Sequence, residues 1–261
     1  MRKPKIIFFD IDGTLIDMQK KQVTPRMLST LHKLQENGIC LAIATGRSPM
    51  TVPLDEFPGV QFDVLVTFNG SYCYDRDHVL FASPIPVEDI RTIRRNAAAL
   101  GRPLCLATGN RMAANGTDPD LAEYFAIAKE QVPITDDFDA IAESGTVYQM
   151  MVGGRREEYD RLMQGVQGAK IAAWWDRAVD IIPTAGGKGI GITHVLEACG
   201  IEKADAMAFG DGNNDLEMFA AVGTCIAMAN GSDALKAAAS DICASCAEDG
   251  IYHYCVENGL I

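Results

Sequence analysis

The feature that most constrains the fold is a repeated order of short apolar runs and helical patterns along the chain. Residues 6–9, 39–44 and 64–67 are short runs of almost only apolar side chains, as expected for strands buried on both faces. Between the first two runs, Thr24 and Pro25 are typical of a helix start. This strand–helix–strand order predicts a parallel sheet with right-handed crossovers.

The same order returns in the C-terminal part of the chain. Helical patterns occur at residues 190–199, 216–221 and 234–239, and strand-like runs at 206–209 and 225–227. The expected fold class is therefore α/β, with a doubly wound parallel-sheet (Rossmann-like) core.

The middle of the chain has a different pattern. A hairpin is expected at residues 72–79 and a helix at 87–100. Further strands are expected at 104–107, 147–152, 171–175 and 179–182, and further helices at 121–128 and 157–167. Because this segment has strands and helices of its own, we expect an inserted α+β cap domain at residues 83–181, within a core formed by 1–82 and 182–261.

Charge and composition exclude several classes of function. The formal net charge of −12 argues against a broad nucleic-acid or membrane surface, but a few local cations and a metal ion can still hold a small anion. No apolar stretch has the length of a signal-peptide core or a membrane span. Of the eight cysteines, Cys243 and Cys246 have metal-ligand spacing but lack a second pair. A reduced cytoplasmic protein is therefore expected. The expected oligomeric state is a monomer or a homodimer.

Polar motifs follow several of the predicted strands. Parallel α/β sheets bind ligands beyond the carboxyl ends of their strands, so these motifs are expected to converge there. The residues concerned are Asp10 and Asp12 after the first strand, Thr45, Gly46 and Arg47 after the second, Lys188 at a helix start, and Asp211, Asn214 and Asp215 after residues 206–209.

The chemistry of this set is coherent. Carboxylates held close together repel one another, and Mg²⁺, which prefers oxygen ligands, relieves the repulsion. Lys188 adds a fixed positive charge, Thr45 a hydroxyl group, and Gly46 a backbone that a phosphoryl group can approach. An aspartate can attack phosphorus and form an aspartyl-phosphate, while a second carboxylate moves the proton. The set therefore predicts phosphoryl transfer.

The four motifs resemble those of the haloacid dehalogenase superfamily of phosphohydrolases. They read Asp10-Ile-Asp-Gly-Thr14, Ala44-Thr-Gly-Arg47, Lys188 and Gly210-Asp-Gly-Asn-Asn-Asp215. The inserted block after the second motif, with Asn69-Gly70 before it, resembles the Cof-like branch with a type-two (C2B) cap. The resemblance covers essentially the whole chain.

The resemblance implies a role for each matching residue. Asp10 is implied as nucleophile and magnesium ligand, and Asp12 as general acid/base with its carbonyl group on the metal. Thr45, Gly46, Lys188 and Asn214 are implied to bind phosphate. Asp211 is implied as a metal ligand, and Asp215 as a ligand or a group directly behind one. The implied reaction is Mg²⁺-dependent hydrolysis of a small phosphorylated metabolite, with a sugar phosphate as substrate.

Other interpretations remain open at the level of sequence. Two roles are open for Arg47: contact with substrate, or pairing with a surface carboxylate. Arg91, Arg94 and Arg95 form a basic helical patch, for which a solvated face is favoured over a second phosphate site. A phosphomutase of the phosphomannomutase type would need such a site. A phospho-accepting signalling module is disfavoured by the chain length and the inserted cap.

Overall fold

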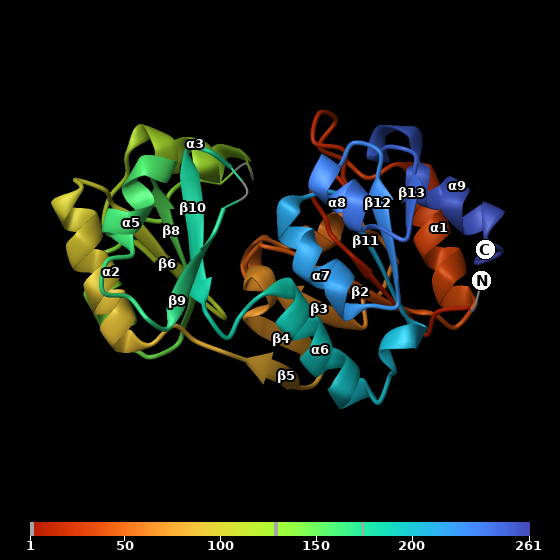
Figure 1. The fold of residues 1–261 in the computed structure, drawn as a ribbon, viewed down its shortest axis with the longest axis horizontal. Helices are drawn as coiled ribbons and strands as arrows, with labels where there is room; N and C mark the ends of the chain where they lie inside the picture. Colours follow the sequence, from red (N-terminus) through yellow and green to blue (C-terminus); the bar gives the residue numbers. More distant parts are fainter. Residues whose placement is uncertain (1–2, 128–129, 174) are drawn as a thin grey trace. The chain divides into compact units, whose positions relative to one another are not determined.

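A computed structural model describes residues 3–127, 130–173 and 175–261 (Figure 1). The chain divides into two compact units, the first comprising residues 3–46, 53–81 and 188–261, and the second 47–52 and 82–187. From the sequence, the inserted domain was expected at residues 83–181. The second unit extends further because Thr184 donates its backbone N–H to the carbonyl of Gly168 at 2.9 Å, which holds the segment after 181 to this unit.

The first unit is built on an eight-stranded sheet of order β13-β12-β11-β1-β2-β3-β4-β5. All neighbours from β13 to β3 are parallel, and β4 is antiparallel to β3. This confirms the α/β fold class with its mostly parallel core sheet. The strands are β1 (Ile6–Phe9), β2 (Cys40–Ala44), β3 (Val64–Thr67), β4 (Tyr72–Asp75), β5 (Val79–Ala82), β11 (Ala206–Gly210), β12 (Thr224–Met228) and β13 (Asp241–Cys243).

Helices cover both faces of this sheet (Figure 1). They are α1 (Pro25–Glu36) and α9 (Gly250–Glu257) on one face, and α6 (Lys188–Cys199), α7 (Leu216–Ala221) and α8 (Asp233–Ala238) on the other. Ile192, Met218 and Leu235 of the second group share an apolar cluster with Phe8 of β1. On the opposite face, the ring of Tyr254 in α9 packs edge-on against Phe209, with ring centroids 5.6 Å apart. Burial on both faces explains why the strands are continuously apolar.

The start of α1 is fixed by the residues predicted to start it. The side chain of Thr24 accepts a hydrogen bond from the backbone N–H of Met27, and Pro25 occupies the first helical position. The threonine thereby satisfies one of the N–H groups that a helix start leaves without a partner.

The second unit has a five-stranded antiparallel sheet of order β7-β6-β8-β10-β9. Side chains of α2, α4 and α5 share an apolar cluster with alternate residues of this sheet, while α3 contacts β8 and β10. The elements are α2 (Val87–Ala99), β6 (Leu104–Thr108), β7 (Met112–Ala114), α3 (Pro119–Ile127), α4 (Phe138–Ala142), β8 (Val147–Gly153), α5 (Tyr159–Leu162), β9 (Ala169–Ala172) and β10 (Ala178–Pro183). This is the separate antiparallel sheet expected for the α+β insertion.

Two expectations for this unit were wrong. The strand expected at 171–175 ends at Ala172, so Trp175 lies in the connection to β10, while Trp174 lies outside the described residues. The helix expected at 157–167 is a 3₁₀ turn, Arg156–Glu158, followed by the short α5. Gly165 has a φ of 80°, which ends any helical continuation.

The other short 3₁₀ turns, in both units, are Pro49–Thr51, Leu54–Glu56, Phe68–Gly70, Lys203–Asp205, Asn213–Asp215 and Cys246–Glu248.

Two of the three arginines of the basic patch on α2 are paired with carboxylates. Arg91 forms hydrogen bonds with Glu88 and Glu143, and Arg94 pairs with Asp139. These carboxylates neutralise most of the positive charge that a second phosphate site would require. No helix among the described residues is long and apolar enough to cross a membrane.

A second group of ion pairs, in the same unit, is much less exposed. Arg102 donates to Asp118, Asp120 and Glu158, and Asp120 also accepts from Arg155 and Arg177. Although burial raises the pKa of Asp120, hydrogen bonds from Arg177 and Arg102 outweigh burial and lower it below its ordinary value. The stabilisation from this carboxylate is therefore present above about pH 4 and is lost as the pH falls below that value.

We expect Arg102→Met to destabilise the protein, because it leaves three partly buried carboxylates without their shared cation. The Arg102 side chain is 20% exposed. The expected loss in free energy of unfolding is therefore about 2–4 kcal/mol, slightly below the range for fully buried pairs. Urea unfolding followed by circular dichroism measures it. Arg91→Met, which removes an exposed arginine with two carboxylate partners, is the matched control and should cost much less; equal losses would contradict the prediction.

Candidate active site

The candidate site lies where β1 and β11 end next to one another. Asp10 follows β1, and Asp211 follows β11. Lys188 is the first residue of α6, and Asp215 ends the 3₁₀ turn that leads into α7. Because β1 and β11 pair in parallel, their carboxyl ends lie at one edge of the sheet. Residues far apart in the sequence thereby meet, as the motif positions predicted.

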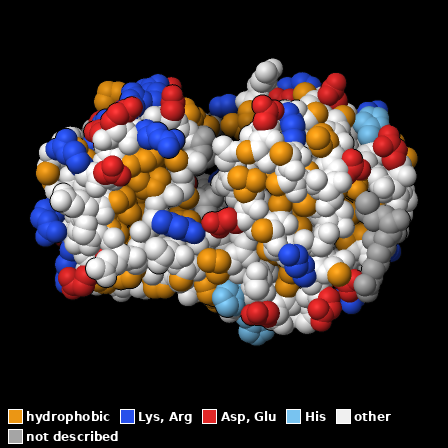
Figure 2. All heavy atoms as spheres, in the orientation of Figure 1, with side chains coloured by type: hydrophobic (Ala, Val, Ile, Leu, Met, Phe, Trp, Pro, Cys, Tyr) orange, Lys and Arg blue, Asp and Glu red, His pale blue; other side chains and the backbone are white. Residues whose placement is uncertain are grey.

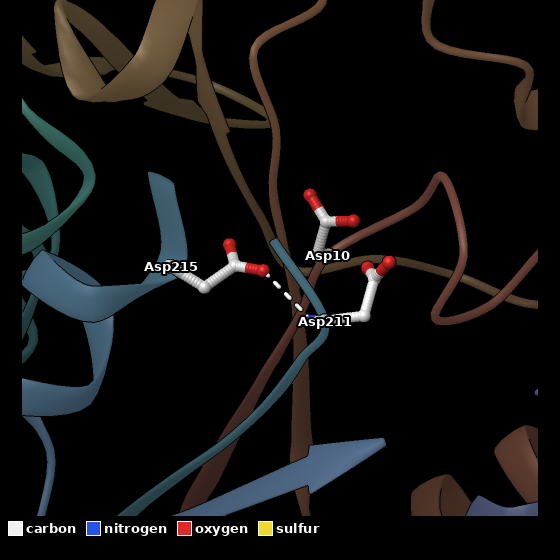
Figure 3. A group of neighbouring side chains, drawn as sticks. All are labelled: Asp10, Asp211 and Asp215. Atoms are coloured by element: carbon white, nitrogen blue, oxygen red, sulfur yellow. Dashed lines mark hydrogen bonds between the residues drawn. The ribbon is translucent and has the colours of Figure 1, made fainter. Parts of the chain in front are cut away.

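Three carboxylates form the centre of the site (Figure 3). One carboxylate oxygen from each of Asp10, Asp211 and Asp215 lies within 4.8 Å of the others. Lys188 Nζ donates to Oδ1 of Asp10 and to Oδ1 of Asp215, both at 2.6 Å. The lysine side chain is 0% exposed, so its charge acts on these carboxylates without screening by bulk water.

Asp215 connects Lys188 to the backbone of the Asp211 loop. Its Oδ2 accepts the backbone N–H of Asp211 at 2.9 Å (Figure 3). The same oxygen accepts the backbone N–H of Gly212 at 2.9 Å, while Oδ1 accepts from Lys188. Asp215 is fully buried. With three hydrogen bonds to its two oxygens, this carboxylate fixes the positions of Lys188 and of the Asp211 backbone.

The loop after β1 is shaped around Asp211. Thr14 Oγ1 donates to Asp211 Oδ1 at 2.9 Å. Gly13 has a φ of 93°, and a Cβ at this position would lie 2.2 Å from Asp211 Oδ2, so only glycine fits. Asn230 Nδ2 donates to the carbonyl of Gly13 at 2.9 Å. Thr14 and Asn230 therefore support the site, although neither was among the predicted site residues; Thr14 stood inside the quoted first motif.

The electrostatics of the site show an excess of negative charge. Burial raises the pKa of Asp10 well above its ordinary value; Lys188 opposes this, and Asp215 and Asp211 add to it. Burial, together with the charge of Asp215, raises the pKa of Asp211 to about 7, against the hydrogen bond from Thr14. Burial alone would lower the pKa of Lys188, but the charges of Asp10 and Asp215 outweigh it and raise that pKa. The lysine therefore stays charged.

The donor set fits a hard divalent cation. Asp10 and Asp211 supply carboxylate oxygens, the type of ligand that Mg²⁺ prefers. One lysine cannot neutralise three carboxylates, and a cation between Asp10 and Asp211 would relieve the repulsion that adds to burial in raising their pKa values.

The remaining predicted residues lie as follows. Asp12 is partly exposed, two residues beyond Asp10. Thr45 is buried at the end of β2, with Gly46 after it, and the carbonyl of Thr45 accepts the backbone N–H of Asn69. Asn214 Nδ2 donates to Asn69 Oδ1 at 3.4 Å. Arg47 belongs to the second unit, where it donates to the carbonyl of Thr51 at 2.9 Å.

The fold and this acidic cluster define an α/β enzyme whose ligand site lies at the carboxyl ends of parallel strands. The chain belongs to the haloacid dehalogenase-like hydrolase family, whose sequence pattern matches residues 7–255. Its relatives place it, within that family, among the phosphatases of subclass IIB.

Individual relatives agree with this assignment. The chain is 32% identical over 259 residues to the putative phosphatase YkrA of Bacillus subtilis, and the aligned residues cover 98% of each chain. It superposes with a TM-score of 0.91 and 26% identity on a solved member of a phosphoryl-transfer superfamily, covering 99% of this chain and 100% of that one. A subclass IIB sugar phosphatase gives a TM-score of 0.87 at 25% identity, with 98% and 100% covered.

Proposed function

We propose that the protein is a Mg²⁺-dependent phosphatase that hydrolyses small phosphate monoesters, sugar phosphates among them, through an aspartyl-phosphate on Asp10. The observation that carries the proposal is the fixed position of Asp10, hydrogen-bonded to a fully buried lysine at 2.6 Å and surrounded by two further carboxylates. The similarity to a sugar phosphatase supports the substrate class.

In the first step, a carboxylate oxygen of Asp10 forms a bond to phosphorus while the bond from phosphorus to the ester oxygen breaks. Asp12 gives its proton to the departing oxygen. Lys188 orients Asp10 through their hydrogen bond, and its charge opposes the burial that raises the pKa of Asp10. Thr45, Gly46 and Asn214 bind the oxygens of the phosphoryl group. The products of this step are a free alcohol and a phosphorylated Asp10.

In the second step, Asp12 accepts a proton from water, which attacks the same phosphorus atom. The bond from phosphorus to Asp10 breaks, so that inorganic phosphate leaves and both aspartates return to their starting states. Asp10 and Asp211, with the main-chain carbonyl of Asp12, would hold Mg²⁺, and Asp215 supports them from behind. Mg²⁺ bound there would neutralise negative charge on the phosphoryl oxygens.

A phosphate-release screen over a panel of metabolite esters tests the proposal, with Mg²⁺ and with a chelator. We expect release that requires the metal. We also expect Mg²⁺ alone to raise the thermal unfolding midpoint, because a ligand present at about 100 times its Kd stabilises the native state by about 2.7 kcal/mol. Asp211→Asn should weaken this shift. Release that persists in chelator would contradict the metal dependence, and no release from any ester would contradict the function.

The same screen separates hydrolysis from phosphomutase activity. A phosphomutase would depend strongly on a bisphosphorylated sugar as activator, whereas a phosphatase releases phosphate without one. Pairing of Arg91 and Arg94 with carboxylates favours the phosphatase.

A further inference from the structure

The loop after β3 has an unusual backbone. Phe68, Asn69 and Gly70 follow one another with φ values of 51°, 50° and 87°. Left-handed φ is costly for a bulky residue such as phenylalanine, and such strain persists only where the surroundings enforce it. Here Thr67 Oγ1 donates to the carbonyl of Tyr72 at 2.9 Å and closes the loop. Strained backbone of this kind is common at functional sites. The contacts that the loop makes therefore indicate why the strain is retained.

The loop presents the side chain of Asn69 to two predicted phosphate-binding segments. The Asn69 backbone N–H donates to the carbonyl of Thr45 at 3.0 Å, and its Oδ1 accepts from Asn214 Nδ2 at 3.4 Å. Both terminal atoms of its amide lie 3.1 Å from where a Cβ on Gly46 would stand. Asn69 is 3% exposed. One buried residue therefore joins the two segments: its backbone bonds to Thr45 after β2, and its side chain packs against Gly46 and bonds to Asn214 after β11.

We propose that Asn69 is a positioning residue for phosphate: it fixes the amide of Asn214 and the backbone of Thr45 and Gly46 in the orientation that the phosphoryl group needs. The proposal rests on the proposed function, in which these residues bind phosphate. Rigid support of this kind matters because small displacements of binding groups cost much of the rate.

Asn69→Gly tests the role of the side chain separately from that of the backbone. Glycine adopts a φ of 50° without strain, so the loop is expected to keep its shape while the amide is lost. We expect kcat/KM to fall about 10–100-fold and the affinity for inorganic phosphate in the presence of Mg²⁺ to fall in parallel. The affinity for Mg²⁺ itself should not change. Lys21→Gly, at an exposed residue with the same φ of 50°, is the matched control and should behave as wild type.

A double-mutant cycle shows whether Asn69 acts through Asn214. If it does, Asn69→Gly should have little further effect once Asn214→Ala is present, because coupled residues are not additive. Equal effects of Asn69→Gly in both backgrounds, or unchanged phosphate affinity in the single variant, would overturn the proposal while leaving the proposed function intact. A wild-type protein that neither binds inorganic phosphate nor releases it from esters would overturn both.

If Asn69→Gly does not fold, Asn69→Ala provides the second variant. It removes the same amide, and a left-handed φ costs alanine only about 1–2 kcal/mol of backbone strain. We expect it to weaken binding of inorganic phosphate by a similar factor, because Asn214 loses the same acceptor. Wild-type affinity in this variant would overturn the proposal.

Discussion

Replacing Asp10 by asparagine is expected to abolish phosphate release while leaving the protein folded. The amide has nearly the shape of the carboxylate but cannot attack phosphorus, and Lys188 retains Asp215 as a partner. Loss of a nucleophile costs on the order of 10⁴–10⁶ in kcat in other hydrolases. Burial disfavours the charge on Asp10, so removing that charge should not lower the unfolding midpoint.

Steady-state phosphate release on the best ester of the screen measures this effect, with thermal unfolding as the second readout. Asp233→Asn is the matched control, because Asp233 is an exposed aspartate in the first turn of α8 in the same unit. It should retain wild-type activity. An Asp10→Asn variant within about tenfold of wild type would exclude Asp10 as the nucleophile.

Lys188→Met is expected to damage both activity and stability. Methionine fills a similar apolar volume but leaves Asp10 and Asp215 buried without the cation that both of them contact. Breaking a buried ion pair from one side typically costs about 3–5 kcal/mol. Activity should fall about 10³-fold, the scale on which one electrostatic group in a closed site acts. Lys33→Met, at an exposed lysine of α1, is the control.

A double variant distinguishes the two effects. Adding Asp215→Asn to Lys188→Met removes one of the uncompensated charges, so part of the stability should return while activity stays low. Urea unfolding and phosphate release measure the two outcomes separately. If the double variant is as unstable as the single one, uncompensated charge is not the reason for the loss.

The parallel core was predictable because its physical causes are local in the sequence. β1 and β3 begin and end as expected, since strands buried on both faces read as continuous apolar runs. The acidic cluster was also predictable in outline, because each of its residues directly follows a strand or starts a helix. The pairing of Asp10, Lys188 and Asp215 at hydrogen-bond distance agrees with that expectation.

Other parts of the structure leave no comparable local signal. The helix α9 starts at Gly250 after Asp249, whose φ is 54°, and depends on packing against the sheet rather than on its own propensity. The support given by Thr14 to Asp211 spans 197 positions. Asparagine before glycine is compatible with left-handed backbone at Asn69, but neither the left-handed Phe68 nor the contact between Asn69 and Asn214 follows from residue type or spacing.

The pairing of β1 with β11 also has a consequence for the order of folding. Ile6 is aligned with Ala206, so the strand that leads to Asp10 finds one of its two neighbours only after about two hundred further residues have been synthesised. Contacts so distant in sequence form late, because closing a long loop costs entropy before the pairing compensates for it. The carboxylates are thus brought together near the end of folding, and an incomplete chain on the ribosome carries Asp10 without the partners that would make it reactive.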